Sequence, residues 1–195
     1  VAVGHVAVAS GKRSSAFGKN AYASGNFSTA SGYRANASNE YSMALGVQAT
    51  ASGTNSTAIG RGAIASNTDA VALGANAKAS GINSLASGLN AVASGRGSAA
   101  FGNRATASGT YSTALGSCAT ASGNYSTASG LYSTASGSFS QATGVLANAI
   151  GNYSQASGFI AKATGKASLA LGNAANAFGD SATALGDQAI AGETN

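Results

Sequence analysis

The sequence predicts an all-β fold, a parallel β-solenoid of about 14 coils with 14 residues in each coil. Two regularities predict it. Glycine occupies every seventh position from 4 to 193, and only Asn39, Asn67 and Glu193 interrupt that series of 28 positions. Alanine stands two residues before every one of these positions, and from position 11 onward Ser or Ala stands four residues before.

A period of seven is also the mark of a coiled coil, in which large apolar residues lie three and four positions apart. This chain has no such seam, and a helix would lose about 1 kcal/mol for each interior glycine. Collagen needs glycine at every third position, which the sequence does not provide. A strand fits better, because small residues spaced by two point to one face.

Each heptad therefore predicts one short strand that ends at the glycine, followed by a tight corner. The two variable residues after each glycine, such as Lys12 and Arg13, turn the chain so that the next strand begins in phase. Because the small residues share one face, we expect that face to line the interior of the coil.

Alternate heptads differ, so the true period is 14 residues. In one set the residue before glycine is often large and apolar, and in the other set it is nearly always serine, from Ser10 and Ser24 to Ser136. Ser31, Ser87, Ser129, Thr143 and Ser157 interrupt the first set, while Ile150 and Phe178 interrupt the second. The large apolar members of the first set, called the apolar column below, are Val3, Phe17, Leu45, Ile59, Leu73, Phe101, Leu115, Leu171 and Leu185.

The composition argues against a conventional layered core. Most of the 44% hydrophobic content is alanine, and only 8% of the residues are charged. The net charge of +5 comes from basic residues that are scattered along the chain and form no cluster, so we expect no nucleic-acid partner.

No constellation of catalytic or metal-ligating residues is present in the sequence. The chain has one cysteine, Cys118, which we expect to be exposed at a corner, and one histidine, His5. These residues predict neither a metal site nor a catalytic triad, and we expect no cofactor and no enzymatic activity. A hexapeptide-repeat acyltransferase would require a six-residue period. No apolar run approaches the ~20 residues of a membrane span, so we expect any export signal or membrane anchor to lie outside residues 1–195.

The apolar column requires a cover, because an exposed stripe of this kind promotes aggregation. Association of identical chains with closed rotational symmetry provides that cover, since a repeat on one face meets its own copy in register. The column is therefore the predicted interface between copies of the chain.

Three segments carry a family resemblance: residues 55–60, 69–74 and 167–172. They resemble the repeat of the YadA-like head of trimeric autotransporter adhesins, and the pattern covers essentially all of residues 1–195 as a single head region excised from a longer chain. The resemblance implies a left-handed β-roll and a homotrimer with apolar columns facing a common axis. It also implies a stalk and an outer-membrane anchor beyond this segment, at the surface of a Gram-negative bacterium.

The same resemblance implies adhesion, as a virulence factor, to host extracellular-matrix or cell-surface proteins of the collagen, fibronectin or laminin class, or autoagglutination. The collagen association of the family attaches to an Asn-Ser-Val-Ala-Ile-Gly form, which residues 55–60 approach with Thr57 in the Val place. Alternative functions are a phage or matrix fibre element, or an ice-binding solenoid that uses the recurring Thr-Ala-Ser segments.

The corner residues carry most of the variation between coils, so we expect ligand binding there. Tyr111, Tyr125, Phe139 and Tyr153 are spaced by 14 residues and predict a ladder of stacked rings, with Phe27 and Tyr41 as an earlier pair. Such a ladder stabilises a solenoid without any ligand, and it also offers contact area to a partner. The candidate ligand surface comprises Tyr111, Tyr125, Phe139, Tyr153, Arg61, Arg96 and Arg104.

Overall fold

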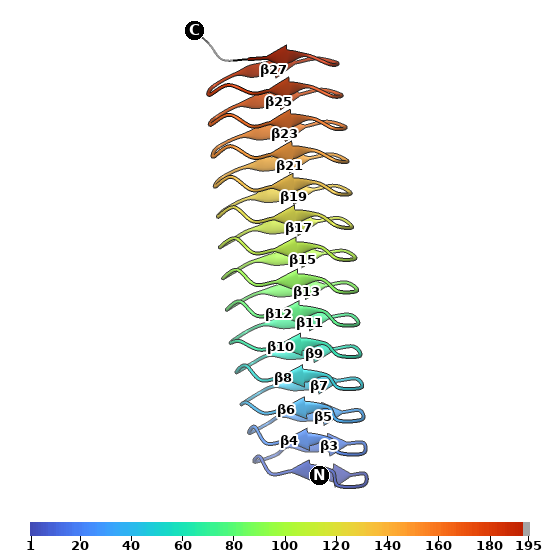
Figure 1. Cartoon of the computed structure of the whole chain (residues 1–195). Coiled ribbons are helices and arrows are strands. Elements are labelled where there is room, and N and C mark those ends of the chain that lie inside the picture. Colours follow the sequence, from blue (N-terminus) through green and yellow to red (C-terminus); the bar gives the residue numbers. More distant parts are fainter. Residues whose placement is uncertain (193–195) are drawn as a thin grey trace. The chain divides into compact units, whose positions relative to one another are not determined.

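The computed structural model describes residues 1–192, which form two compact units, Val1–Gly97 and a second unit that begins at Ser98. Each unit is a stack of seven coils, and each coil has two strands of two or three residues (Figure 1). All strand pairs within a unit are parallel, and the described residues contain no helix. The predicted parallel β-solenoid of about 14 coils is confirmed.

In the first unit, the odd-numbered strands pair with one another in one sheet and the even-numbered strands in another. We call these sheet A and sheet B. Sheet A contains β1 (Ala2–Val3), β3 (Ser15–Phe17), β5 (Thr29–Ser31), β7 (Met43–Leu45), β9 (Thr57–Ile59), β11 (Val71–Leu73) and β13 (Leu85–Ser87). Sheet B contains β2 (Val8–Ala9), β4 (Tyr22–Ala23), β6 (Asn36–Ala37), β8 (Thr50–Ala51), β10 (Ile64–Ala65), β12 (Lys78–Ala79) and β14 (Val92–Ala93).

The second unit repeats this arrangement, and the same sheet names are used. Sheet A contains β15 (Ala99–Phe101), β17 (Thr113–Leu115), β19 (Thr127–Ser129), β21 (Gln141–Thr143), β23 (Gln155–Ser157), β25 (Leu169–Leu171) and β27 (Thr183–Leu185). Sheet B contains β16 (Thr106–Ala107), β18 (Thr120–Ala121), β20 (Thr134–Ala135), β22 (Asn148–Ala149), β24 (Lys162–Ala163), β26 (Asn176–Ala177) and β28 (Ile190–Ala191).

The interior of each coil is lined by small residues from both sheets. Ala30 of β5 and Ala37 of β6 are 0% exposed, as are their counterparts in nearly every inner coil. Neighbouring strands pair with a shift of 14 residues, so that Ala30 lies opposite Ala16 and Ala44. The predicted inward face is therefore confirmed, and its alanine side chains leave room only for two closely spaced sheets.

Nearly every corner is a four-residue turn closed by a backbone hydrogen bond. At the corner after β3, the Ala21 N–H donates to the Gly18 carbonyl at 3.2 Å, and Asn20 has a φ of 57°. A positive φ at the third residue of the turn alone is the signature of a type II turn. We call the corner after a sheet-A strand corner 1 and the corner after a sheet-B strand corner 2.

The two columns of strand-ending positions, which lie one residue after the sheet-A strands and two residues after the sheet-B strands, meet different backbone requirements. Glycines that end sheet-A strands have φ values between 117° and 142°, a region that side chains rarely adopt, whereas those that end sheet-B strands do not have positive φ. A Cβ atom on Gly123 of sheet B would lie 2.0 Å from the Gly137 carbonyl oxygen. Asn39 and Asn67 both end sheet-B strands, and the Asn39 amide donates to the Ser52 carbonyl at 2.7 Å. Glu193 lies outside the described residues.

Serine and alanine divide the inner corner positions between them. At corner 2 the first inward residue is usually serine, and in most coils its hydroxyl donates to the carbonyl three residues earlier. The hydroxyls of Ser98, Ser140 and Ser154 have no such partner. Ser28 donates to Gly25 at 2.6 Å and Ser126 donates to Gly123 at 2.6 Å. At corner 1 the same place usually holds alanine, such as Ala119. The buried serines therefore satisfy turn carbonyls at one corner and serve the scaffold.

Candidate binding surfaces

The apolar column lies on the outward face of sheet A, at the last residue of each strand. Within the first unit Leu45 lies opposite Ile59, and Ile59 lies opposite Leu73; within the second unit Phe101 lies opposite Leu115. Phe17, Ile59, Phe101, Leu115, Leu171 and Leu185 are exposed, as is Val3, and Leu45 and Leu73 are half-buried. The structure thus gathers the predicted interface residues into columns, and none is covered by its own chain.

A second apolar series lies beside this column and was missed by the sequence analysis. The first residue of each three-residue sheet-A strand also points outward, and four of these residues, Met43, Val71, Leu85 and Leu169, are large and apolar. Val71 lies opposite Leu85 in the register of β11 and β13. The spacing of two between Val71 and Leu73 could have predicted this second series, since residues two apart share one face of a strand. The apolar face of the first unit is therefore two side chains wide.

The predicted aromatic ladder is present at corner 2 of the second unit. Ring centroids of Tyr111 and Tyr125 are 5.4 Å apart, those of Tyr125 and Phe139 are 4.8 Å apart, and those of Phe139 and Tyr153 are 5.2 Å apart. The interplanar angles are 22°, 6° and 0°. All four rings stay about half exposed, so that Tyr153, for example, is 56% accessible. They are stacked on one another and still present their edges to a partner.

The backbone beside the ladder is held by asparagine side chains. Asn124 Oδ1 accepts a hydrogen bond from the Thr110 N–H at 3.0 Å, and Asn152 Oδ1 accepts one from the Ser138 N–H at 2.9 Å. Each amide links its coil to the preceding one. The ladder therefore stands on a corner whose coils are fixed in register.

Phe27 and Tyr41 form the earlier stack, at corner 2 of the first unit, with centroids 5.1 Å apart. The Arg13 guanidinium carbon lies 5.6 Å from the Phe27 ring centroid, within the range of a cation–π interaction. The first unit thus repeats the ladder on a smaller scale, with a positive charge at its end.

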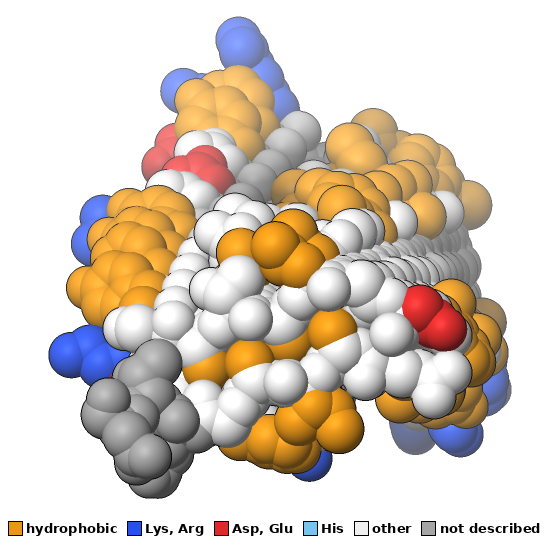
Figure 2. Space-filling view, turned by 90° about the horizontal axis from the view of Figure 1, so that it is seen from above, with side chains coloured by type: hydrophobic (Ala, Val, Ile, Leu, Met, Phe, Trp, Pro, Cys, Tyr) orange, Lys and Arg blue, Asp and Glu red, His pale blue; other side chains and the backbone are white. Residues whose placement is uncertain are grey.

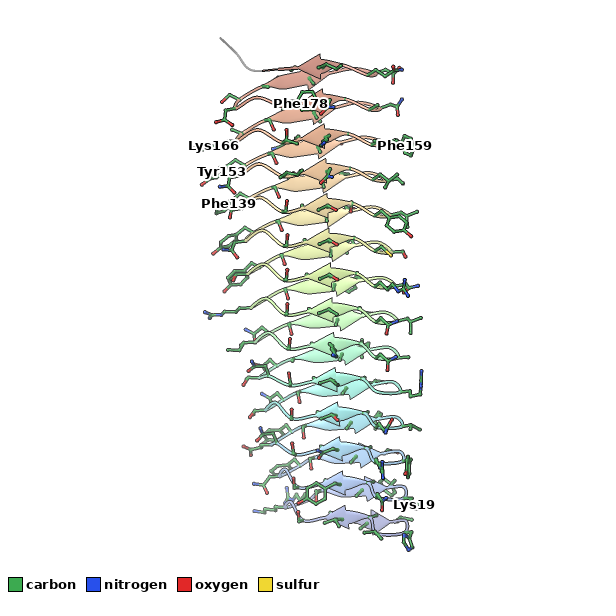
Figure 3. The ribbon with its side chains drawn as sticks, viewed as in Figure 1. Lys19, Phe139, Tyr153, Phe159, Lys166 and Phe178 are labelled. Atoms are coloured by element: carbon green, nitrogen blue, oxygen red, sulfur yellow. The ribbon has the colours of Figure 1, made fainter. Side chains whose placement is uncertain are left out.

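The seven candidate ligand residues do not form one patch. In the second unit the ladder lies at corner 2, whereas Arg104 lies at corner 1. In the first unit Arg61 lies at corner 1 and Arg96 at corner 2. Figure 3 shows the two edges, with Phe139, Tyr153 and Lys166 along one and Phe159 along the other. Arg104 is therefore not a neighbour of the ladder within its unit.

A family model for the YadA head domain repeat matches residues 1–21, 9–35, 37–63, 65–92, 93–117, 119–140, 128–145 and 163–189. The chain belongs to this family. YadA heads are known for adhesion in trimeric autotransporters of the bacterial cell surface. No curated protein matches the chain.

The outward face of sheet B gives these YadA head repeats a polar side. Thr106, Thr120 and Thr134 are in register in the second unit, but Asn148 and Lys162 continue the same series. Ile150 and the nearby Phe178 are exposed on this face. Figure 2 shows the hydrophobic side chains in separate groups around the coil, with polar side chains and backbone between them. Within the second unit the threonine rank is therefore interrupted.

Cys118 of the head lies at corner 1, as the sequence predicts, but it is half-buried rather than exposed. Its φ of 56° places it at the third residue of the turn, and the Ser117 hydroxyl lies 3.9 Å from its sulfur. Among residues 1–192 no group of three His, Cys, Asp or Glu side chains is arranged to hold a metal ion. Within the same range no helix is long and apolar enough to cross a membrane.

Proposed function

We propose that this chain is a non-catalytic adhesion module that works as a homotrimer at the outer membrane of a Gram-negative bacterium. The observation that carries the proposal is the exposed apolar column of sheet A in a chain of the YadA head family. A stalk and a membrane anchor would lie outside residues 1–195. The outer face of the trimer would bind host extracellular-matrix or cell-surface molecules, or promote autoagglutination.

The exposed sheet-A face supports self-association. Burying a leucine-sized side chain that is about half exposed contributes about 1 kcal/mol, and the column offers one such contact in most coils. Identical chains with the same spacing between coils can bring every contact into register at once. Three chains around a common axis close the assembly without leaving an unpaired copy of the face.

The ladder at corner 2 is the part of the surface best suited to a ligand. It is exposed, it is rigid, and its rings require little further loss of side-chain entropy on binding. A trimer would present three such ladders, and the net charge of +5 on each chain would become +15 and attract acidic partners. Collagen, fibronectin and laminin are the partners that we would test first.

The serine chemistry supports a non-catalytic role. Ser126 and most of its counterparts are buried and donate their hydroxyl groups to glycine carbonyls. A nucleophilic serine needs its hydroxyl paired with a base, and His5 is an exposed residue at a corner. Repeated serines of this kind stabilise the turn at corner 2 of most coils.

Binding to immobilised collagen, fibronectin and laminin by surface plasmon resonance tests this proposal. One variant replaces Tyr111, Tyr125 and Tyr153 by serine, and a matched control replaces Thr106, Thr120 and Thr134 of sheet B by alanine. We expect the parent chain and the control to bind at least one of the three proteins, and the tyrosine variant to bind at least about tenfold more weakly. Absence of binding to all three, or equal binding by the tyrosine variant, contradicts the proposed ligand surface.

A further inference from the structure

Five coils lack a large apolar residue in the column, and each of them carries one just across the strand-ending glycine. In these coils the place of the apolar column holds a small polar residue: Ser31, Ser87, Ser129, Thr143 or Ser157. Two residues later, at the first place of corner 1, these coils carry Tyr33, Leu89, Leu131, Val145 and Phe159.

The other nine coils show the reverse arrangement. They have an apolar residue in the column, and their first corner-1 place is polar, charged or alanine in every case except Val47. Phe17 is followed by Lys19, and Leu171 is followed by Asn173. Each coil therefore has a large apolar side chain on one side of the glycine or on the other, and only the coil with Leu45 and Val47 has both.

The two places are close neighbours, since residues two apart are separated by at most about 7 Å along the chain. Corner 1 is stacked as regularly as the strands: the Gln48 N–H donates to the Tyr33 carbonyl at 2.8 Å, and the Leu146 N–H donates to the Leu131 carbonyl at 2.9 Å. The corner side chains are exposed, and Phe159 is 52% accessible. In the five coils, the exposed apolar side chain thus lies at the first place of corner 1 and not at the neighbouring end of the sheet-A strand.

The scaffold itself does not require this exchange. Neither place is buried within the coil, so an apolar residue at one does not replace packing lost at the other. The exchange is required by a partner that contacts every coil, because such a partner needs an apolar side chain in each coil. A second copy of this chain fits, since its coils repeat with the same spacing and its own face carries the same exchange.

We propose that Tyr33, Leu89, Leu131, Val145 and Phe159 belong to the self-association face and replace the apolar column in the five coils that lack it. The inference rests on the proposed assembly and adds residues to its interface. Three of these residues, Leu131, Val145 and Phe159, occupy corner 1 in successive coils of the second unit. Figure 3 shows Phe159 on the edge opposite Phe139 and Tyr153 of the aromatic ladder. In these coils the interface moves toward corner 1, and the ladder at corner 2 stays free.

A swap of residues between coils tests the proposal with the full chain. The first variant carries Leu131→Asn and Phe159→Asn, which remove the corner side chains. The second adds Ser129→Leu and Ser157→Leu, so that both coils acquire the arrangement of Leu171 and Asn173. The control carries Asn103→Ser and Asn173→Ser, at the same corner place in coils whose column is apolar.

Light scattering over a dilution series measures the concentration at which half of the assembly dissociates, and circular dichroism above that concentration confirms folding. We expect the first variant to raise this concentration at least about tenfold, the second to restore it, and the control to leave it unchanged. A first variant with the parent value, or a second variant that fails to restore it, overturns the inference while the assembly stands. A parent chain that is monomeric at all concentrations overturns both.

Discussion

Sheet A and sheet B share an inner lining and differ in everything that faces outward. Both contribute buried alanines two residues before the strand-ending position, such as Ala114 and Ala121. Outside, sheet A carries the apolar column, whereas sheet B carries mainly serine, threonine and asparagine. The comparison shows that the inward residues specify the coil, while the outward residues of sheet A leave an apolar face exposed.

The strand-ending glycines extend the comparison to the backbone. Sheet A has glycine at this place in all of its coils, with positive φ throughout. Sheet B accepts Asn39 and Asn67, because its backbone there does not require positive φ and the amide finds a carbonyl acceptor. At this place sheet A thus has glycine alone, whereas sheet B has asparagine in two of its coils.

The largest expected effect comes from placing charges on the sheet-A face. The double variant Ile59→Asp and Leu73→Asp should dissociate or unfold the assembly, because two unpaired carboxylates per chain would enter an apolar interface at a cost of about 3–5 kcal/mol. Ser52→Asp with Ser66→Asp places the same charges on sheet B and should leave the mass unchanged. Unchanged mass and melting temperature in the sheet-A variant would defeat the interface assignment.

A smaller effect should separate the two glycine columns. Gly116→Asn forces a side chain into a backbone with φ of 133°, and we expect it to lower the free energy of unfolding by about 3 kcal/mol. Gly123→Asn copies the natural sheet-B exceptions and needs no positive φ, but its Cβ atom would meet the Gly137 carbonyl oxygen, so the backbone must shift. Because Asn39 and Asn67 occupy the same place in other coils, we expect a smaller loss than for Gly116→Asn. Urea unfolding at one protein concentration compares them, and equal losses would show that φ is not what distinguishes the columns.

The smallest effect concerns the aromatic ladder at corner 2. Phe139→Ser removes two stacking contacts and should lower the free energy of unfolding by about 2 kcal/mol, since each pair contributes about 0.5–1.5 kcal/mol. Ala167→Ser, at the same place of a coil without stacked rings, is the control and should change stability little. If the two variants unfold alike, the ladder does not stabilise the solenoid.

The repeat made much of this structure predictable. A spacing of seven with glycine and alanine in fixed places predicted the strands and the inward face, and the spacing of 14 between aromatic residues predicted the ladder from Tyr111 to Tyr153. The period of 14 also places Arg104 and Tyr111, which are seven residues apart, at opposite corners of the coil. The prediction of one ligand surface containing both residues did not take this into account. The different φ values of Gly116 and Gly123 were not predictable, because glycine adopts either conformation and its identity does not reveal which one is used.

Half-burial of Cys118 was likewise outside the reach of the sequence, because it depends on how the turn packs beside Ser117 and the neighbouring coils. Val71 and Leu73 are two residues apart and could have predicted that the apolar face is two side chains wide. The prediction considered only the residue before each glycine. Positions defined by the repeat were predicted well, and positions defined by the contacts between neighbouring coils were not.

The mass of the purified chain in solution tests most directly whether the apolar face of sheet A is a self-association interface. Light scattering should give three times the 18.4 kDa of one chain. A monodisperse mass of 18.4 kDa at every concentration would contradict it, because the exposed column would then persist in water without a partner.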